Sequence, residues 1–117
     1  MTSAGAAPSH PRPLDRTLAA LADPHRRRVV DLLRERPHRA GELAAVLELT
    51  PPVMSRHLRV LRESGLVDDA HPAFDARVRI YTLRSGPMDE LRSWLAATER
   101  GWVGELTAFK DHVEQQR

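Results

Sequence analysis

Residues 40–67 read AGELAAVLELTPPVMSRHLRVLRESGLV, and this stretch contains two amphipathic helical patterns close together. Apolar residues recur at helical spacing over about 40–47 and again over 51–63, with a turn of about three residues between the two runs. Two short helices joined by such a turn, the second with one apolar stripe and a basic outer face, are typical of a helix-turn-helix. We therefore predict a helix-turn-helix whose recognition helix spans 51–63.

This second helix carries signals at both of its ends as well as along its length. Thr50 is predicted to be its N-cap residue, and two prolines fill the first turn, where their missing N–H groups cost little. Met54, Leu58 and Leu61 recur at i, i+4 and i+7 and form its buried stripe. Gly65 stands where the end of a helix favours positive φ. The pattern predicts a helix that is fixed to the protein along its inner side.

The outer side of the same helix is basic. The formal charges within 51–62 are Arg56, Arg59 and Arg62, all of them positive. In a helix inserted into the DNA major groove, the N-terminal positions reach base edges, and an arginine can bind guanine through two hydrogen bonds. We assign base reading to Ser55 and Arg56, and phosphate contacts to Arg59 or Arg62.

Two strand patterns follow the recognition helix directly, over 66–70 and 77–83. A hairpin in this place is a wing, so the predicted fold is a winged helix-turn-helix, mainly α with a small β-hairpin. Arg77 and Arg79 fall on one side of the second strand, where they would reach the DNA backbone or minor groove. The wing tip, 70–76, is long and flanked by acidic residues, which oppose a contact with phosphate. The predicted DNA-contacting residues are Thr50, Pro52, Ser55, Arg56, Arg59, Arg62, Arg77 and Arg79.

A proline-rich segment and two further helical patterns precede the helix-turn-helix. Residues 1–13 combine three prolines with small residues and are predicted to be a disordered arm. A first helix is predicted over 14–22 and a second over 24–35, where Asp23 is the N-cap and Pro24 the first helical residue.

A long last helix is predicted over 87–113, and both tryptophans of the chain lie on its apolar stripe. Because the preceding helices already supply a core for a chain of this size, we predict that the stripe packs against a second copy of the chain. The predicted dimer-interface residues on the first and last helices are Leu14, Leu18, Leu91, Trp94, Leu95, Trp102 and Leu106.

The composition fits one globular domain and offers little for catalysis. The 117 residues are 41% hydrophobic and 29% charged, and they include no cysteine. Disulfides, thiolate nucleophiles and sulfur-ligated metals are therefore excluded. Neither a glycine-rich phosphate loop nor a Ser, His and acid arrangement stands out, so we predict no enzyme and no cofactor.

Charge is unevenly distributed along the chain. Residues 1–66 carry 11 Lys/Arg and 7 Asp/Glu, a net +4, whereas 67–117 carry 7 and 9, a net −2. The basic part contains the predicted recognition helix, which fits a nucleic-acid partner. No secretory signal or membrane span is visible in the sequence, so a cytoplasmic protein without a membrane partner is expected.

Three motifs in the chain resemble the ArsR family of bacterial winged-helix repressors. They are LADPHRRRVVDLL at 21–33, GELA at 41–44 and SRHLRVLRESGLV at 55–67. The resemblance covers roughly 14–102. It implies an ArsR-type winged-helix domain over 14–104, with the helix over 87–113 contributing to a dimer interface.

The resemblance also implies a mode of action. ArsR-like regulators act as homodimers that bind an imperfect inverted repeat in double-stranded DNA and repress a nearby gene or their own. An inducer, in many members a metal ion, releases them. Members that sense metal through the third helix use cysteines, which this chain lacks, and on the last helix only Asp111, His112 and Glu114 cluster. We predict no metal site and leave the inducer, small molecule or metal, unidentified.

Four alternatives stay open at this level. The basic helix could be incidental in a winged-helix module that binds another protein. His71 and three nearby aspartates have the ligand types that suit zinc or nickel. Trp94 and Trp102 could line an inducer pocket between protomers. His57 could contact a phosphate or form a hydrogen bond within the motif.

Overall fold

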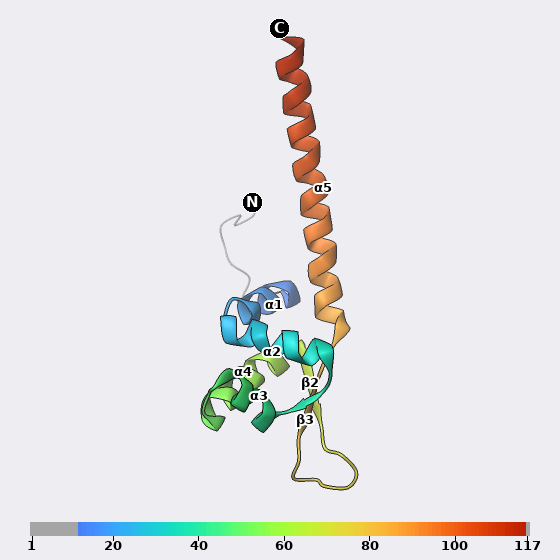
Figure 1. The fold of residues 1–117 in the computed structure, drawn as a ribbon. Coiled ribbons are helices and arrows are strands. Elements are labelled where there is room, and N and C mark those ends of the chain that lie inside the picture. The colour runs from blue at the N-terminus through green and yellow to red at the C-terminus, as the bar shows by residue number, and fades with distance from the viewer. Residues whose placement is uncertain (1–11, 117) are drawn as a thin grey trace, which may run out of the picture.

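The chain forms a cluster of short helices and strands from which one long helix projects (Figure 1). The computed structural model describes residues 12–116. Its elements are α1 (Pro13–Leu21), α2 (Pro24–Glu35), β1 (His38–Arg39), α3 (Ala40–Leu47), α4 (Pro51–Glu63), β2 (Val67–Ala70), β3 (Ile80–Leu83) and α5 (Ser85–Gln115). The long axis of the molecule follows α5, and the extents are 71 × 38 × 26 Å. The mainly helical winged helix-turn-helix predicted from the sequence is confirmed.

The four short helices lie where the sequence predicts them. α2, α3 and α4 have the predicted bounds, and α1 begins at Pro13, one residue earlier than expected. Because Pro13 is helical, the predicted arm over 1–13 is too long at its C-terminal end. Residues 1–11 of that arm lie outside the described part of the chain.

Asp23 caps α2 as predicted. Its Oδ1 accepts hydrogen bonds from the backbone N–H groups of His25, at 2.8 Å, and Arg26, at 3.2 Å. Two of the N–H groups that a helix N-terminus leaves without partners are thereby satisfied. A carboxylate at this end also interacts favourably with the helix dipole.

The turn between α3 and α4 depends on one residue in a left-handed conformation. Glu48 has φ 55° and ψ 43°, which costs a residue other than glycine about 1 kcal/mol. The backbone N–H of Leu49 donates to the carbonyl of Ala44 at 2.9 Å and closes the end of α3. Gly65 ends α4 with φ 80°, as its position predicts.

Thr50 occupies the N-cap position of α4, but its side chain makes no capping hydrogen bond. An N-cap oxygen accepts from the N–H of the second or third helical residue. Pro52 is the second helical residue and has no N–H, so one of the two usual donors is missing. The predicted side-chain cap is therefore wrong, although the predicted start of the helix is right.

The wing belongs to a three-stranded antiparallel sheet with the strand order β1-β3-β2. The sequence predicted only the β2–β3 hairpin. β1 adds His38 and Arg39, which pair with Tyr81 and Ile80. This third strand ties the segment before α3 to the base of the wing.

β3 is shorter than predicted, because it begins at Ile80 rather than Arg77. The backbone before it takes part in turns instead of the ladder. Asp75 Oδ1 accepts from the N–H of Arg77 at 2.9 Å, and the Asp75 carbonyl accepts from the N–H of Val78 at 3.2 Å. These local bonds compete with strand pairing, so Arg77 and Arg79 are not strand residues.

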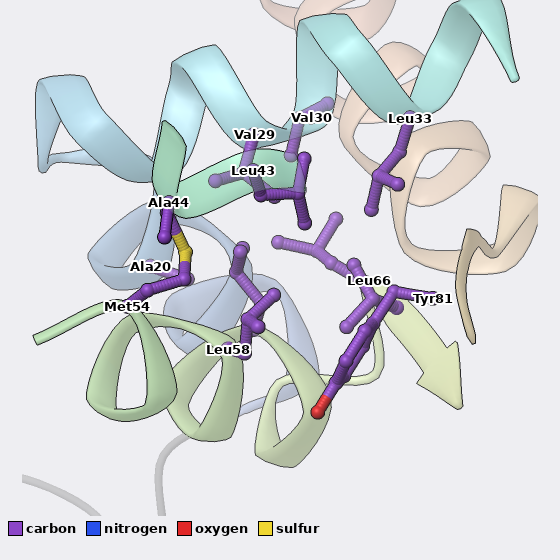
Figure 2. Packing of buried hydrophobic residues seen from close by; sticks show 12 residues of the cluster. Ala20, Val29, Val30, Leu33, Leu43, Ala44, Met54, Leu58, Leu66 and Tyr81 are labelled. Atoms are coloured by element: carbon purple, nitrogen blue, oxygen red, sulfur yellow. The ribbon is translucent and has the colours of Figure 1, made fainter. Parts of the chain in front are cut away.

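The core lies between α2, α3, α4 and the sheet (Figure 2). The α4 stripe of Met54, Leu58 and Leu61 is buried to 1% exposure or less, as its spacing predicts. Removing such side chains from water stabilises a fold by roughly 1.5–3 kcal/mol each. This packing fixes the inner side of α4, and its outer side therefore faces away from the protein.

α5 is helical as predicted, but it starts at Ser85 rather than Pro87 and ends at Gln115. Within the described range, no residue of α5 is buried in the single chain. Its N-terminal part contacts α1, and the rest projects away from the other elements (Figure 1). Beyond this N-terminal part, the apolar stripe of α5 is exposed and has no apolar partner among residues 12–116.

Candidate DNA interface

The outer face of α4 presents two arginines that the other described residues leave free. Ser55, Arg56 and Arg59 are all exposed. Across residues 12–116, neither Arg56 nor Arg59 forms a side-chain hydrogen bond or an ion pair. Thr50 and Pro52 are exposed at the leading end of the same helix. Since an arginine side chain offers five N–H donors, this face is well supplied for binding acceptors on DNA.

A hollow of about 240 Å³ lies between α4 and the base of the wing. We call it the arginine hollow, and its lining residues are Ser55, Arg59, Arg62, Arg79 and Tyr81. Ser55, Arg59 and Arg62 share one side of α4 because they are spaced by four and three residues. Tyr81 contributes its hydroxyl, which Figure 2 shows at the end of a ring that packs beside the core.

Asp69 joins the two arginines at the edge of this hollow. Its Oδ2 lies 3.4 Å from Nη1 of Arg62 and 3.2 Å from Nε of Arg79. Asp69 is paired with Tyr81 across the β2–β3 ladder, so the carboxylate and the phenol start from neighbouring points of the sheet. The Tyr81 hydroxyl and the Asp69 carboxylate together raise the pKa of Arg79.

The two predicted wing arginines lie in different places. Arg79 faces α4, whereas Arg77 forms an ion pair with Asp75 at the wing tip, with 3.3 Å between Nε and Oδ1. The prediction that both point from one side of a strand is therefore wrong, because β3 begins after them. Only Arg79 is brought together with residues of the recognition helix.

The acidic residues of the wing are paired with arginines. Asp68 lies 3.4 Å from Arg84, Asp69 pairs with Arg62 and Arg79, and Asp75 pairs with Arg77. His71 is held by a 2.9 Å contact between its Nδ1 and the carbonyl of Val78. Within the described residues, His71 and the aspartates are not gathered into a metal-binding group. The negative charge that opposed a phosphate contact is thus largely compensated.

Arg26 links α1, α2 and α4 from the protein side of the helix-turn-helix. Its Nε donates to the carbonyl of Ala20 at 2.7 Å, and its Nη1 donates to Nδ1 of His57 at 3.3 Å. Of the two roles left open for His57, the hydrogen bond within the motif is the observed one. Burial, together with nearby positive charge from Arg26, lowers the pKa of His57, although Asp23 opposes this effect.

Asp23, His25 and His57 are the one group in the described range whose ligand atoms lie within 4.8 Å of one another. The carboxylate of Asp23 already accepts two backbone N–H groups, which lower its pKa although burial alone would raise it. A cation here would also lie beside the Arg26 guanidinium and the positive end of α2. We therefore assign these residues to the attachment of α4 rather than to a metal site.

The predicted dimer residues lie on α1 and α5 and are incompletely covered. Leu14 and Leu91 are half-buried, and Trp102 is 61% exposed. The other large apolar side chains exposed on these two helices are Leu18, Trp94, Leu95, Val103, Leu106, Phe109 and Val113. Within residues 12–116, no helix combines the length and apolar character that crossing a membrane would require.

The fold and this basic helix face define a winged helix-turn-helix regulator of the DNA-binding class. The sequence model of the family described as bacterial regulatory protein, arsR family, matches residues 23–69. The HTH-type transcriptional regulator Rv2034 of Mycobacterium tuberculosis is 37% identical over 102 residues, which cover 87% of this chain and 90% of the relative. The chain belongs to the ArsR family of transcriptional regulators, and its family and fold are not those of enzymes.

Two further proteins agree with this assignment. The transcriptional repressor SdpR of Bacillus subtilis is 24% identical over 82 residues, covering 70% of this chain and 88% of SdpR. The crystal structure of the ArsR family transcriptional regulator RHA00566 matches with a TM-score of 0.71 and 30% identity, covering 78% of this chain and 97% of that one.

Proposed function

We propose that this chain is a homodimeric repressor that binds an inverted-repeat operator and silences a nearby gene or its own. The observation that carries the proposal is that Arg56 and Arg59, on the exposed side of α4, have no partner among residues 12–116. A helix fixed by a buried stripe on one side presents the other side to a partner in a defined orientation. An arginine-bearing face of this kind fits the major groove.

The residues of α4 divide by their distance along the helix. Ser55 and Arg56 lie near its N-terminal end and are proposed to read base edges, whereas Arg59 and Arg62 lie further along and contact phosphates. Thr50 and Pro52, at the N-terminal end of α4, approach the DNA backbone. Arg77 and Arg79 extend the contact from the wing.

A dimer follows from the exposed stripe of α5. Burying Trp94, Trp102 and their apolar neighbours against a second copy would remove a patch that a monomer would otherwise expose to water. A twofold axis would place two α4 helices on one side of DNA, so each site would contain two half-sites about 10 base pairs apart. Repression is proposed from the similarity to SdpR, which is described as a transcriptional repressor.

The test is selection of duplexes from a random DNA pool by the purified protein. We expect enrichment of an inverted repeat whose half-sites are about one helical turn apart. The matched control is Arg28→Ala, which removes one exposed positive charge from α2 and should select the same sequence. If no sequence is enriched at low salt, the chain is not a sequence-specific regulator. That result would favour the alternative of a winged-helix module that binds another protein.

A further inference from the structure

Three arginines line the arginine hollow, and two of them pair with one carboxylate beside it. Arg62 and Arg79 approach the same atom, Oδ2 of Asp69, at 3.4 and 3.2 Å. Arg59 lines the same hollow and forms no ion pair with any residue of the described range. Three positive charges therefore border one hollow, and one carboxylate compensates two of them. Because like charges that border the same hollow repel one another, the hollow is suited to a further anion.

We propose that the arginine hollow binds one phosphate group of the DNA backbone and that Asp69 is a positioning residue for this contact. Asp69 holds Arg62 and Arg79 at a fixed spacing. The inference rests on the proposed DNA binding and deepens it by naming the atoms that the hollow recognises.

The donors left over after the Asp69 contacts fit a phosphate. Each of the two guanidinium groups has five N–H donors, and the ion pairs engage only one nitrogen of each. The remaining N–H groups of each guanidinium can donate to phosphate oxygens, which arginine binds through parallel hydrogen bonds. Tyr81 lines the same hollow, and its hydroxyl is a further donor to phosphate.

The sheet holds Asp69 in place. It lies on β2 directly opposite Tyr81, which is 5% exposed and anchored in the core. The Asp69 side chain is only 20% exposed, while the side chain of its neighbour Asp68 is 58% exposed. A carboxylate fixed in this way keeps an α4 residue and a wing residue together before DNA arrives, which reduces the entropy lost on binding.

Substitution of Asp69 distinguishes a positioning role from an effect of net charge on DNA affinity. Asp69→Asn makes the protein more positive, and long-range attraction alone would then strengthen DNA binding. Positioning predicts the opposite, a weakening. Asp68→Asn is the matched control, because it makes the same charge change on the same strand at a residue that pairs with Arg84, outside the hollow. We expect Asp68→Asn to bind as tightly as the wild type or slightly more tightly, and Asp69→Asn to bind about tenfold more weakly.

The decisive experiment uses the full chain and a selected duplex in which one backbone phosphate at a time is replaced by an uncharged methylphosphonate. For the wild type, we expect one position in each half-site at which replacement weakens binding by about tenfold. At that same position, replacement should weaken binding by Asp69→Asn and by Arg79→Ala clearly less than about tenfold, because part of the contact has already been lost. Thermal unfolding of each variant is measured in parallel. Arg79 is exposed outside the strands, so Arg79→Ala keeps the test valid if Asp69→Asn fails to fold.

Two results would overturn the inference. One is an Asp69→Asn protein that binds as tightly as Asp68→Asn and keeps the full methylphosphonate effect. The other is an Arg79→Ala protein whose sensitive phosphate is unchanged. Both leave DNA binding itself intact, whereas failure of the wild type to bind any duplex would contradict the proposed function instead.

Discussion

The arginines on the two sides of the helix-turn-helix differ in whether the protein itself occupies their donors. Arg26 is half-buried, and its side-chain N–H groups donate to the Ala20 carbonyl and to His57. Arg56 and Arg59 are exposed and unengaged across the described residues. A guanidinium bound to carbonyls stabilises the fold, and one without acceptors is available to a ligand. Arg28 on α2 is exposed and likewise has no partner among the described residues. The proposed DNA contact of Arg56 and Arg59 therefore rests on their place on α4 as well as on their free donors.

His57 should make the stability of the protein depend on pH. Its pKa in the fold is lowered from the ordinary value of 6.5, chiefly by burial, so the unfolded chain takes up the proton first. The stabilisation is complete above that ordinary value and is lost as the pH falls through the lower pKa of the folded state. Urea unfolding of the wild type should therefore show a falling free energy from about pH 7.5 to about pH 5.

The matched variant is His57→Asn, which keeps an acceptor for Arg26 but cannot titrate. The difference in unfolding free energy between the wild type and His57→Asn should shrink steadily over this pH range. A difference that is independent of pH would show that His57 keeps its ordinary titration in the folded protein.

Single-residue predictions succeeded where one local rule decides the outcome. Asp23 caps α2 and Gly65 has positive φ, because neighbouring residues alone set these requirements. The contacts of Asp69 with Arg79 and of Arg26 with His57 were not predicted. Arg26 and His57 are 31 residues apart, and no periodic pattern signals a contact that only the tertiary fold creates.

At the scale of elements, α4 combines an inner stripe that fixes it with an outer face that is proposed to read DNA. Arg56→Ala should weaken operator binding and relax specificity at one base pair by about 1–3 kcal/mol. Competition binding with single-base variants of the selected duplex measures this effect. Arg28→Ala, with the same loss of charge on α2, should leave the base preference unchanged, and both variants should remain dimeric.

An Arg56→Ala protein that loses its dimer would show that Arg56 belongs to a different surface. A protein whose base preference is unchanged would assign Arg56 to the phosphates rather than to a base.

Whole helices were predicted more accurately than strands, for a physical reason. α4 has an apolar period, a C-terminal glycine and prolines in its first turn, which agree on its bounds. β1 has only two residues, too few for an alternating pattern, so it could not be predicted. Apolar and polar residues do alternate over 77–83. However, Asp75 accepts hydrogen bonds from the backbone N–H groups of Arg77 and Val78, which a longer β3 would need for strand pairing.

At the scale of the whole molecule, α5 is proposed to set the distance between two recognition helices. Trp102→Ala should raise the dimer dissociation constant by about 30-fold or more, the effect of removing an interface hot spot of about 2 kcal/mol. DNA affinity should fall as the dimer dissociates, since one protomer alone contacts only one half-site. Sedimentation velocity over a concentration series measures the first effect.

Arg100→Ala is the control on the same helix, about 200° around from Trp102. It should leave the dimer unchanged. A Trp102→Ala protein that dimerises normally would place the interface elsewhere and would leave the exposed stripe of α5 without its proposed partner.

The central claim is that the basic face of α4 binds DNA, and its most direct test is the salt dependence of binding to the selected duplex. Each neutralised phosphate releases counterions, so a dimer with several phosphate contacts should lose about a hundredfold or more in affinity between about 50 and 200 mM salt. Fluorescence anisotropy with the wild type should give this steep, linear fall of log affinity against log salt. A flat dependence, or no binding at about 50 mM salt, would contradict the account.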